Sequence, residues 1–204
     1  MRDDPPLSPE LLLQAYRVGV FPMSESRDNP DVFWVDPRQR GILPLPGFHI
    51  SRSLRKTLNS HRFSVTLNAD FRGVLQGCAA RPETWINDTI FDLYMSLHMR
   101  GNAHAAEVWQ DGTLVGGVYG VAIGGAFFGE SMFSTATDAS KTALAALTHH
   151  LHGRGFTLFD TQFMTPHLRS LGALEIPRAR YHALLDIALD LNVEIGPPGP
   201  LPVP

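Results

Sequence analysis

The chain has 204 residues, of which 44% are hydrophobic and 18% are charged, and its formal net charge is −3. These values allow a sizeable buried core and argue against a disordered chain. The single cysteine, Cys78, excludes an intramolecular disulfide and a cysteine-rich metal site. The N-terminal MRDDPPLSPE has no basic start or apolar run, and no uncharged stretch reaches the roughly 20 apolar residues of a membrane helix. We therefore expect a soluble, cytoplasmic protein that does not enter a membrane.

The positive charges are concentrated in one part of the chain. Residues 37–69 hold six cations and no acid, which leaves 11 cations and 20 acids, a charge of −9, elsewhere; the six are Arg38, Arg40, Arg52, Arg55, Lys56 and Arg62. A mildly acidic protein with one basic segment suggests a local contact with a polyanion. The alternative is a solvated basic face that has no partner.

The first 45 residues are predicted to form a small N-terminal domain. Ser8 and Pro9 suit the start of a helix over residues 11–18, and Gly19 suits its end. A proline-rich, irregular stretch follows as far as Pro46. Residues 46–204 then form the second domain.

A second helix is predicted over residues 49–58. Its apolar residues recur every four positions, which gives one buried face. Arg52, Arg55 and Lys56 are spaced i, i+3 and i+4, so they share another face. The sequence therefore predicts three cations in one patch on a rigid element.

The remaining elements follow an α+β pattern. Asp111-Gly112 lies between two alternating segments and indicates a hairpin. The tail from Gly196 to Pro204 holds five prolines and is expected to fray. The other predictions, in chain order, are strand 63–67, helices 71–78 and 90–97, strands 105–109, 113–122 and 126–133, helix 139–151, strand 157–162, and helices 167–171 and 180–191. A run of antiparallel strands, then a helix, then another strand is typical of α+β domains.

Three motifs carry little chemistry. Gly129-Glu130-Ser131 lacks the second glycine of a nucleophile elbow. The three histidines between residues 149 and 152 lack metal-ligand spacing and suit a helix C-terminus. The glycines of residues 116–120 form no nucleotide-binding motif, and Cys78 has helical apolar neighbours, as a core residue would. The sequence thus gives no support for a serine hydrolase, a metal, ATP or NAD.

Asp160 and Gln162 form a polar pair in an apolar strand. At positions i and i+2 they point to the same face, and buried polar groups need hydrogen-bond partners. A structural role and a catalytic role both remain open at this point.

Nine motifs in order resemble one family across about residues 8–187. They are SPELLLQAYRVGVFP, FWVDPR, HISRSLRK, TWI, GNAHAAEVWQDGTLVGGVYGV, FFGESMFS, ASKTAL, FDTQ and HLRSLGALEIPR. Together they resemble the leucyl/phenylalanyl-tRNA–protein transferases. The resemblance implies a small N-terminal domain on a GNAT-like, acetyltransferase-type domain. It implies transfer of Leu or Phe, less readily Met, from tRNA to proteins with N-terminal Arg or Lys, which marks them for N-degron degradation.

The same resemblance assigns roles to individual positions. By role these are Asp160, Gln162 and Glu130 in catalysis; Val118, Phe127 and Phe159 in the aminoacyl side-chain pocket; Trp85, Tyr94, Tyr16 and Met23 at the tRNA 3′ adenosine; and Arg52, Arg55 and Lys56 in tRNA binding. Relatives usually have Trp at the position of Met23, and Phe33 also replaces a tryptophan. Met covers a base without the π-face that makes stacking worth about 1–3 kcal/mol.

The implied reaction is aminolysis of an activated ester, so we expect no cofactor and no metal, and a monomer is expected. In our hypothesis Asp160 orients and polarises Gln162, whose carbonyl oxygen receives a hydrogen of the attacking amine. Two alternatives are an acyl-CoA N-acetyltransferase and a non-catalytic RNA-binding protein. The first needs a glycine-rich pyrophosphate loop where this chain has residues 134–138 without glycine. The second leaves the Asp160/Gln162 strand unexplained.

Overall fold

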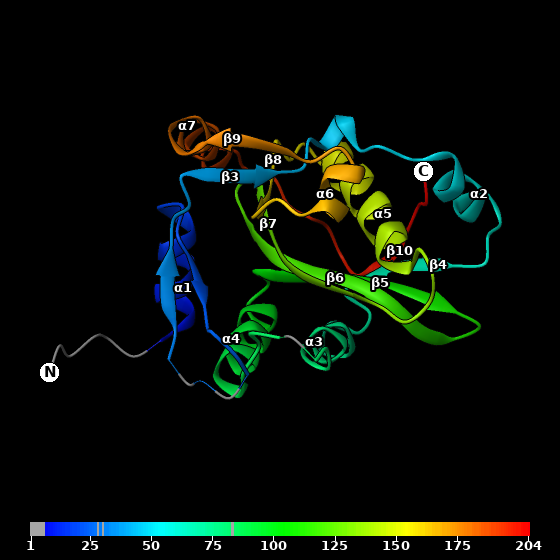
Figure 1. The fold of residues 1–204 in the computed structure, drawn as a ribbon, viewed down its shortest axis with the longest axis horizontal. Helices are drawn as coiled ribbons and strands as arrows, with labels where there is room; N and C mark the ends of the chain where they lie inside the picture. The colour runs from blue at the N-terminus through cyan, green and yellow to red at the C-terminus, as the bar shows by residue number, and fades with distance from the viewer. Residues whose placement is uncertain (1–6, 28, 30, 83) are drawn as a thin grey trace, which may run out of the picture.

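The computed structural model describes residues 7–27, 29, 31–82 and 84–204. The fold is α+β (Figure 1). The helices are α1 Pro9–Arg17, η1 Leu45–Gly47, α2 Arg52–Asn59, α3 Phe71–Ala79, α4 Asp88–Met99, α5 Ala139–Gly153, α6 Pro166–Ser170 and α7 Arg178–Leu189. The strands are β1 Phe21–Met23, β2 Phe33–Val35, β3 Gln39–Ile42, β4 Ser64–Leu67, β5 Ala103–Gln110, β6 Thr113–Ile123, β7 Ala126–Ser134, β8 Leu158–Gln162, β9 Leu174–Pro177 and β10 Gly199–Leu201.

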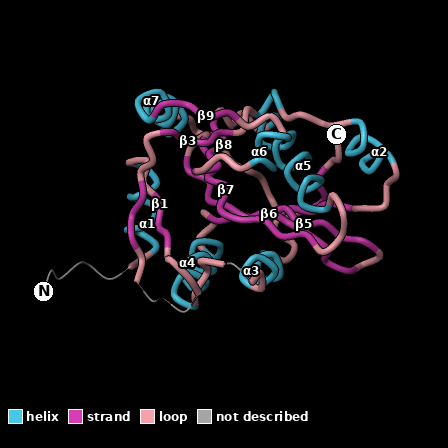
Figure 2. The backbone as a smooth tube through the Cα atoms, in the orientation of Figure 1, coloured by secondary structure: helices cyan, strands magenta, loops and turns pink. Residues whose placement is uncertain are grey.

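One eight-stranded sheet organises the molecule, in the order β10-β4-β5-β6-β7-β8-β3-β9. All its pairings are antiparallel except β7–β8, which is parallel. The expected mainly antiparallel sheet is therefore confirmed. A separate two-stranded ribbon, β1–β2, lies beside α1 at the N-terminal end (Figure 2).

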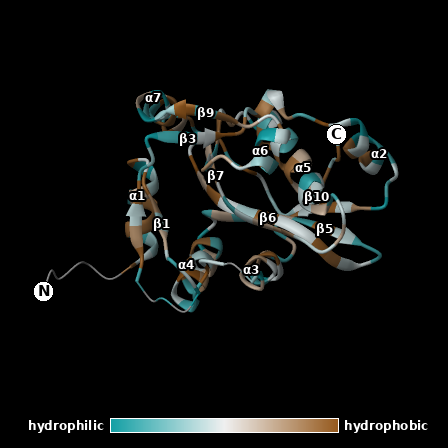
Figure 3. Cartoon of the chain, viewed as in Figure 1, coloured by the Kyte–Doolittle hydropathy of each residue, from teal (hydrophilic) through white to brown (hydrophobic). Residues whose placement is uncertain are grey.

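Helices cover both faces of the sheet and bury two apolar clusters. Helices α3 and α4 lie on one side, and α5 and α6 lie on the other (Figure 1). Helix α5 is buried over most of its length, as the small residues of its ALAAL segment allow. Helix α2 packs on the same side through Leu54 and Leu58. Its mainly hydrophilic colour in Figure 3 reflects the polar residues on its other faces.

Capping residues set several helix boundaries. The Ser8 hydroxyl accepts the N–H of Leu11 at 3.2 Å, so α1 begins at Pro9, as its sequence predicts. The prediction of a helix from residue 49 is wrong by three residues. Ser51 is the N-cap of α2, and its hydroxyl accepts the N–H of Leu54. The three cations of the predicted patch nevertheless lie within α2.

The hairpin is confirmed, but two expectations about irregular segments are wrong. Asp111 and Gly112 adopt φ of 50° and 77° between β5 and β6, as a type I′ turn requires. The tail does not simply fray: β10 pairs with β4, and Leu201 is buried. The proline-rich stretch likewise contains three strands, because β1 and β2 pair with each other and β3 joins the main sheet. Proline lacks an N–H, yet it fits at edge strands such as β10.

The main sheet includes β3, which lies within the first 45 residues. The division into domains 1–45 and 46–204 stays a prediction. Among the described residues, no helix combines the length and apolar character needed to cross a membrane.

Candidate active site

A cavity of about 230 Å³ opens beside the diverging ends of β7 and β8. These strands pair only from Ala126–Phe128 to Leu158–Asp160. Polar and apolar walls meet in the cavity, whose lining residues include Pro22, Met23, Arg81, Trp85, Val118, Glu130, Ser131, Phe159, Thr161 and Gln162. The parting of the two strands thus places a polar pair beside an apolar slot.

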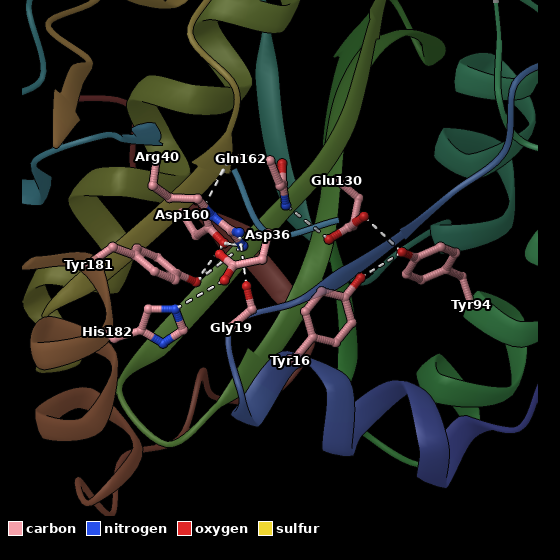
Figure 4. A network of polar contacts seen from close by, with 10 residues as sticks. All are labelled: Tyr16, Gly19, Asp36, Arg40, Tyr94, Glu130, Asp160, Gln162, Tyr181 and His182. Carbon is pink, nitrogen blue, oxygen red and sulfur yellow. Dashed lines mark hydrogen bonds and ion pairs between the residues drawn. The ribbon is translucent and has the colours of Figure 1, made fainter. Parts of the chain in front are cut away.

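Gln162 and Glu130 face each other across this gap (Figure 4). The Gln162 amide nitrogen donates to Oε1 of Glu130 at 3.2 Å. Gly129, which precedes Glu130, permits the close packing, because a Cβ there would lie 2.5 Å from the Phe159 ring. With its nitrogen turned toward Glu130, the amide leaves its carbonyl oxygen available to accept a hydrogen bond.

Asp160 contacts the backbone of Gln162 and not its side chain. Asp160 is fully buried, and its Oδ1 accepts the N–H of Gln162 at 2.8 Å. Gln162 adopts φ of 56°, the left-handed region that non-glycine residues rarely enter. The two residues therefore share a hydrogen bond, as expected of a buried polar pair. In our hypothesis Asp160 polarises the side-chain amide of Gln162, but in the structure that amide is bonded to Glu130.

Glu130 ends a buried chain of hydroxyl groups. Tyr94 donates to Oε2 of Glu130 at 2.7 Å, and the hydroxyls of Tyr16 and Tyr94 are also 2.7 Å apart. Since the Tyr94 proton is used on Glu130, Tyr16 donates to Tyr94. Burial raises the pKa of both tyrosines, and the charge of Glu130 adds to this effect. Burial also raises the pKa of Glu130 to about 7, against the opposing hydrogen bonds from the tyrosines.

This raised pKa makes stability depend on pH. The folded protein keeps a proton on Glu130 between pH 4.5 and about 7, where the unfolded chain loses it. The stability that this proton contributes is fully present below pH 4.5 and is lost as the pH rises through about 7. The loss amounts to about 3 kcal/mol. We expect Glu130→Gln to gain stability relative to the unsubstituted protein by about this amount between pH 5 and pH 8. Urea unfolding of both proteins measures the difference, and a constant difference would contradict the assignment.

The residues expected in the side-chain pocket and at the adenosine divide into two layers. Val118, Phe159, Trp85 and Met23 line the cavity. Phe127, Tyr16 and Tyr94 do not line it. Phe127 packs edge-on against Phe159, with ring centroids 5.1 Å apart, and the two tyrosines are buried behind Glu130. These three residues therefore influence the cavity only through side chains that line it. Phe127 acts through Phe159, and the two tyrosines act through Glu130.

The basic residues of α2 are exposed and lie outside the cavity. Arg52, Arg55 and Lys56 all point to solvent, and Arg55 also donates to the C-terminal Pro204 carbonyl. The six-cation segment does not act as one surface, because Arg40 is fully buried and bonded to Asp160. The charge pattern of the sequence did not indicate that Arg40 is buried.

The structure also locates Cys78 and the three histidines near the end of α5. Cys78 is buried, and burial raises the pKa of its thiol to about 12, so it is a core residue. His149 and His152 are exposed near the end of α5, and His150 bonds to the Ile195 carbonyl. Within the described ranges, no group of three or more His, Cys, Asp or Glu side chains is arranged to hold a metal ion.

Sequence reasoning missed Arg40, Tyr181 and Arg81. Arg40 and Tyr181 both bond to Asp160, from β3 and α7. Arg81 lines the cavity and donates to the Ser131 hydroxyl at 2.9 Å. None of the three stands in a spacing pattern, since each reaches the site from a different, distant part of the chain.

Comparison with known proteins gives consistent results over nearly the whole chain. The sequence model of the leucyl/phenylalanyl-tRNA protein transferases matches residues 42–186, and that of their N-terminal domain matches residues 6–38. A leucyl/phenylalanyl-tRNA–protein transferase of Cereibacter sphaeroides is 60% identical over 98% of this chain and 94% of its own. One from a Ruegeria species is 64% identical over 90% of this chain and 88% of its own.

Among solved structures, FemX shares the fold, with a TM-score of 0.52 over 82% of this chain and 66% of that chain, at 12% identity. This likeness supports the expected GNAT-like architecture. The matches of sequence, over nearly every residue, identify the family: the chain belongs to the leucyl/phenylalanyl-tRNA–protein transferases.

Proposed function

We propose that this protein transfers Leu or Phe, and less readily Met, from aminoacyl-tRNA to the N-terminus of another protein. The observation that carries the proposal is the polar pair of Gln162 and Glu130 beside an apolar cavity. The cavity suits an apolar side chain, and the pair suits the amine and ester that react. Family membership supports the same reaction.

The proposed mechanism combines alignment of the two substrates with acceptance of a hydrogen bond from the attacking amine. An N-terminal amine has a pKa of about 7.7–8.0, so roughly a tenth of it is neutral at pH 7. Alignment of this amine with the ester supplies much of the acceleration, since effective molarities reach about 10⁵–10⁸ M. The carbonyl oxygen of Gln162 accepts a hydrogen bond from the attacking nitrogen. The new C–N bond forms as the ester C–O bond to the tRNA ribose breaks, and the proton lost by the nitrogen ends on the ribose oxygen of the leaving tRNA. When Glu130 is ionised, as it becomes when the pH rises through about 7, its hydrogen bond from the amide nitrogen increases the electron density on the Gln162 carbonyl oxygen.

We further propose acceptor proteins that begin with Arg or Lys, which transfer marks for degradation by the N-degron route. Leu and Phe fit a slot walled by Val118 and Phe159, whereas a β-branched side chain is stiffer and wider near its backbone. An apolar slot separates near-isosteres by about 1–3 kcal/mol, so rejection of Ile and Val is incomplete.

The direct test supplies labelled Leu-tRNA, Phe-tRNA and Ile-tRNA to peptides that begin with Arg or with Ala. The proposal expects label on the Arg peptide from the first two tRNAs and roughly 10–200-fold less from Ile-tRNA. No label from any tRNA would contradict the transfer reaction. Equal label from Ile-tRNA and Leu-tRNA would contradict only the assignment of the slot.

The exposed cations of α2 are expected to bind tRNA and not to act in chemistry. Replacing Arg52 and Arg55 with alanine should weaken tRNA binding, lower the slope of log affinity against log salt by about 0.7–0.9 for each lost phosphate contact, and leave turnover at saturating tRNA nearly unchanged. Binding titrations at several salt concentrations measure the slope.

A matched control replaces Arg17 and Arg180, which are exposed cations on α1 and α7. It removes the same net charge from other surfaces, so its salt slope should stay that of the unsubstituted protein. If the slope of log affinity against log salt falls equally in both double variants, binding depends only on the total charge, and the α2 patch is a solvated face.

A further inference from the structure

Arg40 is an arginine enclosed entirely by the fold. It is fully buried in β3, and its guanidinium lies against the rings of Phe21 and Tyr181 at 4.6 and 4.3 Å from their centroids. Its Nε and Nη2 bond to the two carboxylate oxygens of Asp160 at 2.9 and 2.6 Å (Figure 4). A buried ion pair often stabilises a protein no more than apolar residues of the same volume would. Stability alone is therefore a weak reason for this pair to be present.

Asp160 has no capacity left for a substrate. Its Oδ1 accepts from Arg40 and from the N–H of Gln162, and its Oδ2 accepts from Arg40 and from the Tyr181 hydroxyl at 2.8 Å. A carboxylate offers about four acceptor directions, and all four are used. Asp160 also does not line the cavity. Its influence on the reaction must therefore pass through Gln162.

The contact with Asp160 holds Gln162 in a strained conformation. In the left-handed region an L side chain approaches its own carbonyl group, so a non-glycine residue stays there only when its surroundings fix it. The bond from the Gln162 N–H to Asp160 supplies that restraint at the end of β8. From this backbone position the side chain reaches Glu130.

Arg40 also connects β8 with the segment that leads into β1. Its Nη1 donates to the carbonyl oxygen of Gly19 at 2.9 Å, just before β1. Residues of β1, Phe21 to Met23, line the cavity. One guanidinium thus fixes the distance between the β1 wall and the β8 strand.

We propose that Arg40, supported by Tyr181, is a positioning residue of the transfer reaction, which acts through Asp160 to keep the backbone of Gln162 in the conformation that presents its amide to the cavity. The proposal rests on the proposed function. Although Arg40 is one of the six cations of residues 37–69, the proposal gives it a role in positioning Gln162 and not in tRNA binding.

The test compares Arg40→Lys and Tyr181→Phe with the unsubstituted protein. Lysine keeps the charge but lacks the three separate nitrogens through which Arg40 bonds to Asp160 and Gly19 at once. Phenylalanine removes one hydroxyl and keeps the ring. We expect each variant to lower kcat about tenfold or more, as the loss of a charge-assisted hydrogen bond implies, with the KM for aminoacyl-tRNA within about twofold. The resonance of the Gln162 amide proton should shift in both, because its acceptor moves.

The matched control is Arg178→Lys. Arg178 is a half-exposed arginine that donates to the backbone of Asp36 and Pro37, so it anchors the same segment without touching Asp160. Its kcat and the Gln162 resonance should not change. Should Arg40→Lys fail to fold, Tyr181→Phe still decides the question.

Folded variants with unchanged kcat, or with a changed KM alone, would overturn the proposal. An unsubstituted protein that transfers no amino acid would instead overturn the proposed function, whatever the Gln162 resonance shows. The two failures are therefore distinguishable.

Discussion

Replacing Gln162 with alanine is expected to lower turnover about 10²–10⁴-fold, because it removes the oxygen that, in the proposed mechanism, accepts a hydrogen bond from the attacking amine. Binding of aminoacyl-tRNA should stay close to normal, since the slot and the exposed cations are unaffected. Single-turnover transfer at saturating tRNA measures the chemical step, and a binding titration measures affinity. Gln39→Ala, an exposed glutamine on β3, is the matched control and should change neither quantity.

The double variant with Asp160→Asn sharpens this expectation. If Asp160 acts only through Gln162, the double substitution should slow turnover little more than Gln162→Ala alone, because residues that act as one unit are strongly non-additive. Two effects that multiply would show that Asp160 has a separate role. A folded Gln162→Ala variant with near-normal turnover would leave alignment of the substrates to carry the reaction.

Replacing Asp160 with alanine is expected to lower the free energy of unfolding by about 3–5 kcal/mol, because it leaves the buried charge of Arg40 without its partner. The Tyr181 hydroxyl and the Gln162 N–H lose their acceptor at the same time. Urea unfolding at constant pH measures the change.

The double variant Asp160→Ala/Arg40→Met separates the charge from the loss of packing. It removes both members of the ion pair and fills part of the space with an apolar side chain, so most of the lost stability should return. Activity should not return, because Gln162 still lacks its restraint. If the double variant were less stable than Asp160→Ala, the ion pair would not be the source of the cost.

The sequence predicted α1 and most of the elements after residue 46 because their patterns are local. Ser8 as a cap, Asp111-Gly112 as a turn and the apolar repeats of α3 and α4 depend on neighbours a few residues away. The proline-rich stretch from Phe21 to Pro46 had no such pattern. Its strand β3 is short, and it is held by β8 and β9, which lie more than a hundred residues later.

The candidate site was predictable only in part for the same reason. Alternation placed Asp160 and Gln162 on one strand, and the family resemblance added Glu130. Alternation assumes an extended backbone, whereas the backbone of Gln162 is left-handed. The pattern therefore could not show that the Gln162 side chain turns away from Asp160 toward Glu130. The partners of Asp160 come from β3 and α7, and no spacing in the sequence connects Arg40 with Tyr181.

The pairing of β10 with β4 has a consequence for how the chain can be altered. Gly199–Leu201 covers a strand whose other side pairs with β5, so the last residues close one border of the sheet. A shortened chain would leave the N–H and C=O groups of β4 open to strands of other molecules, and such open borders promote aggregation. Any fusion partner or affinity tag should therefore be placed so that Gly199–Leu201 stays free to pair with β4.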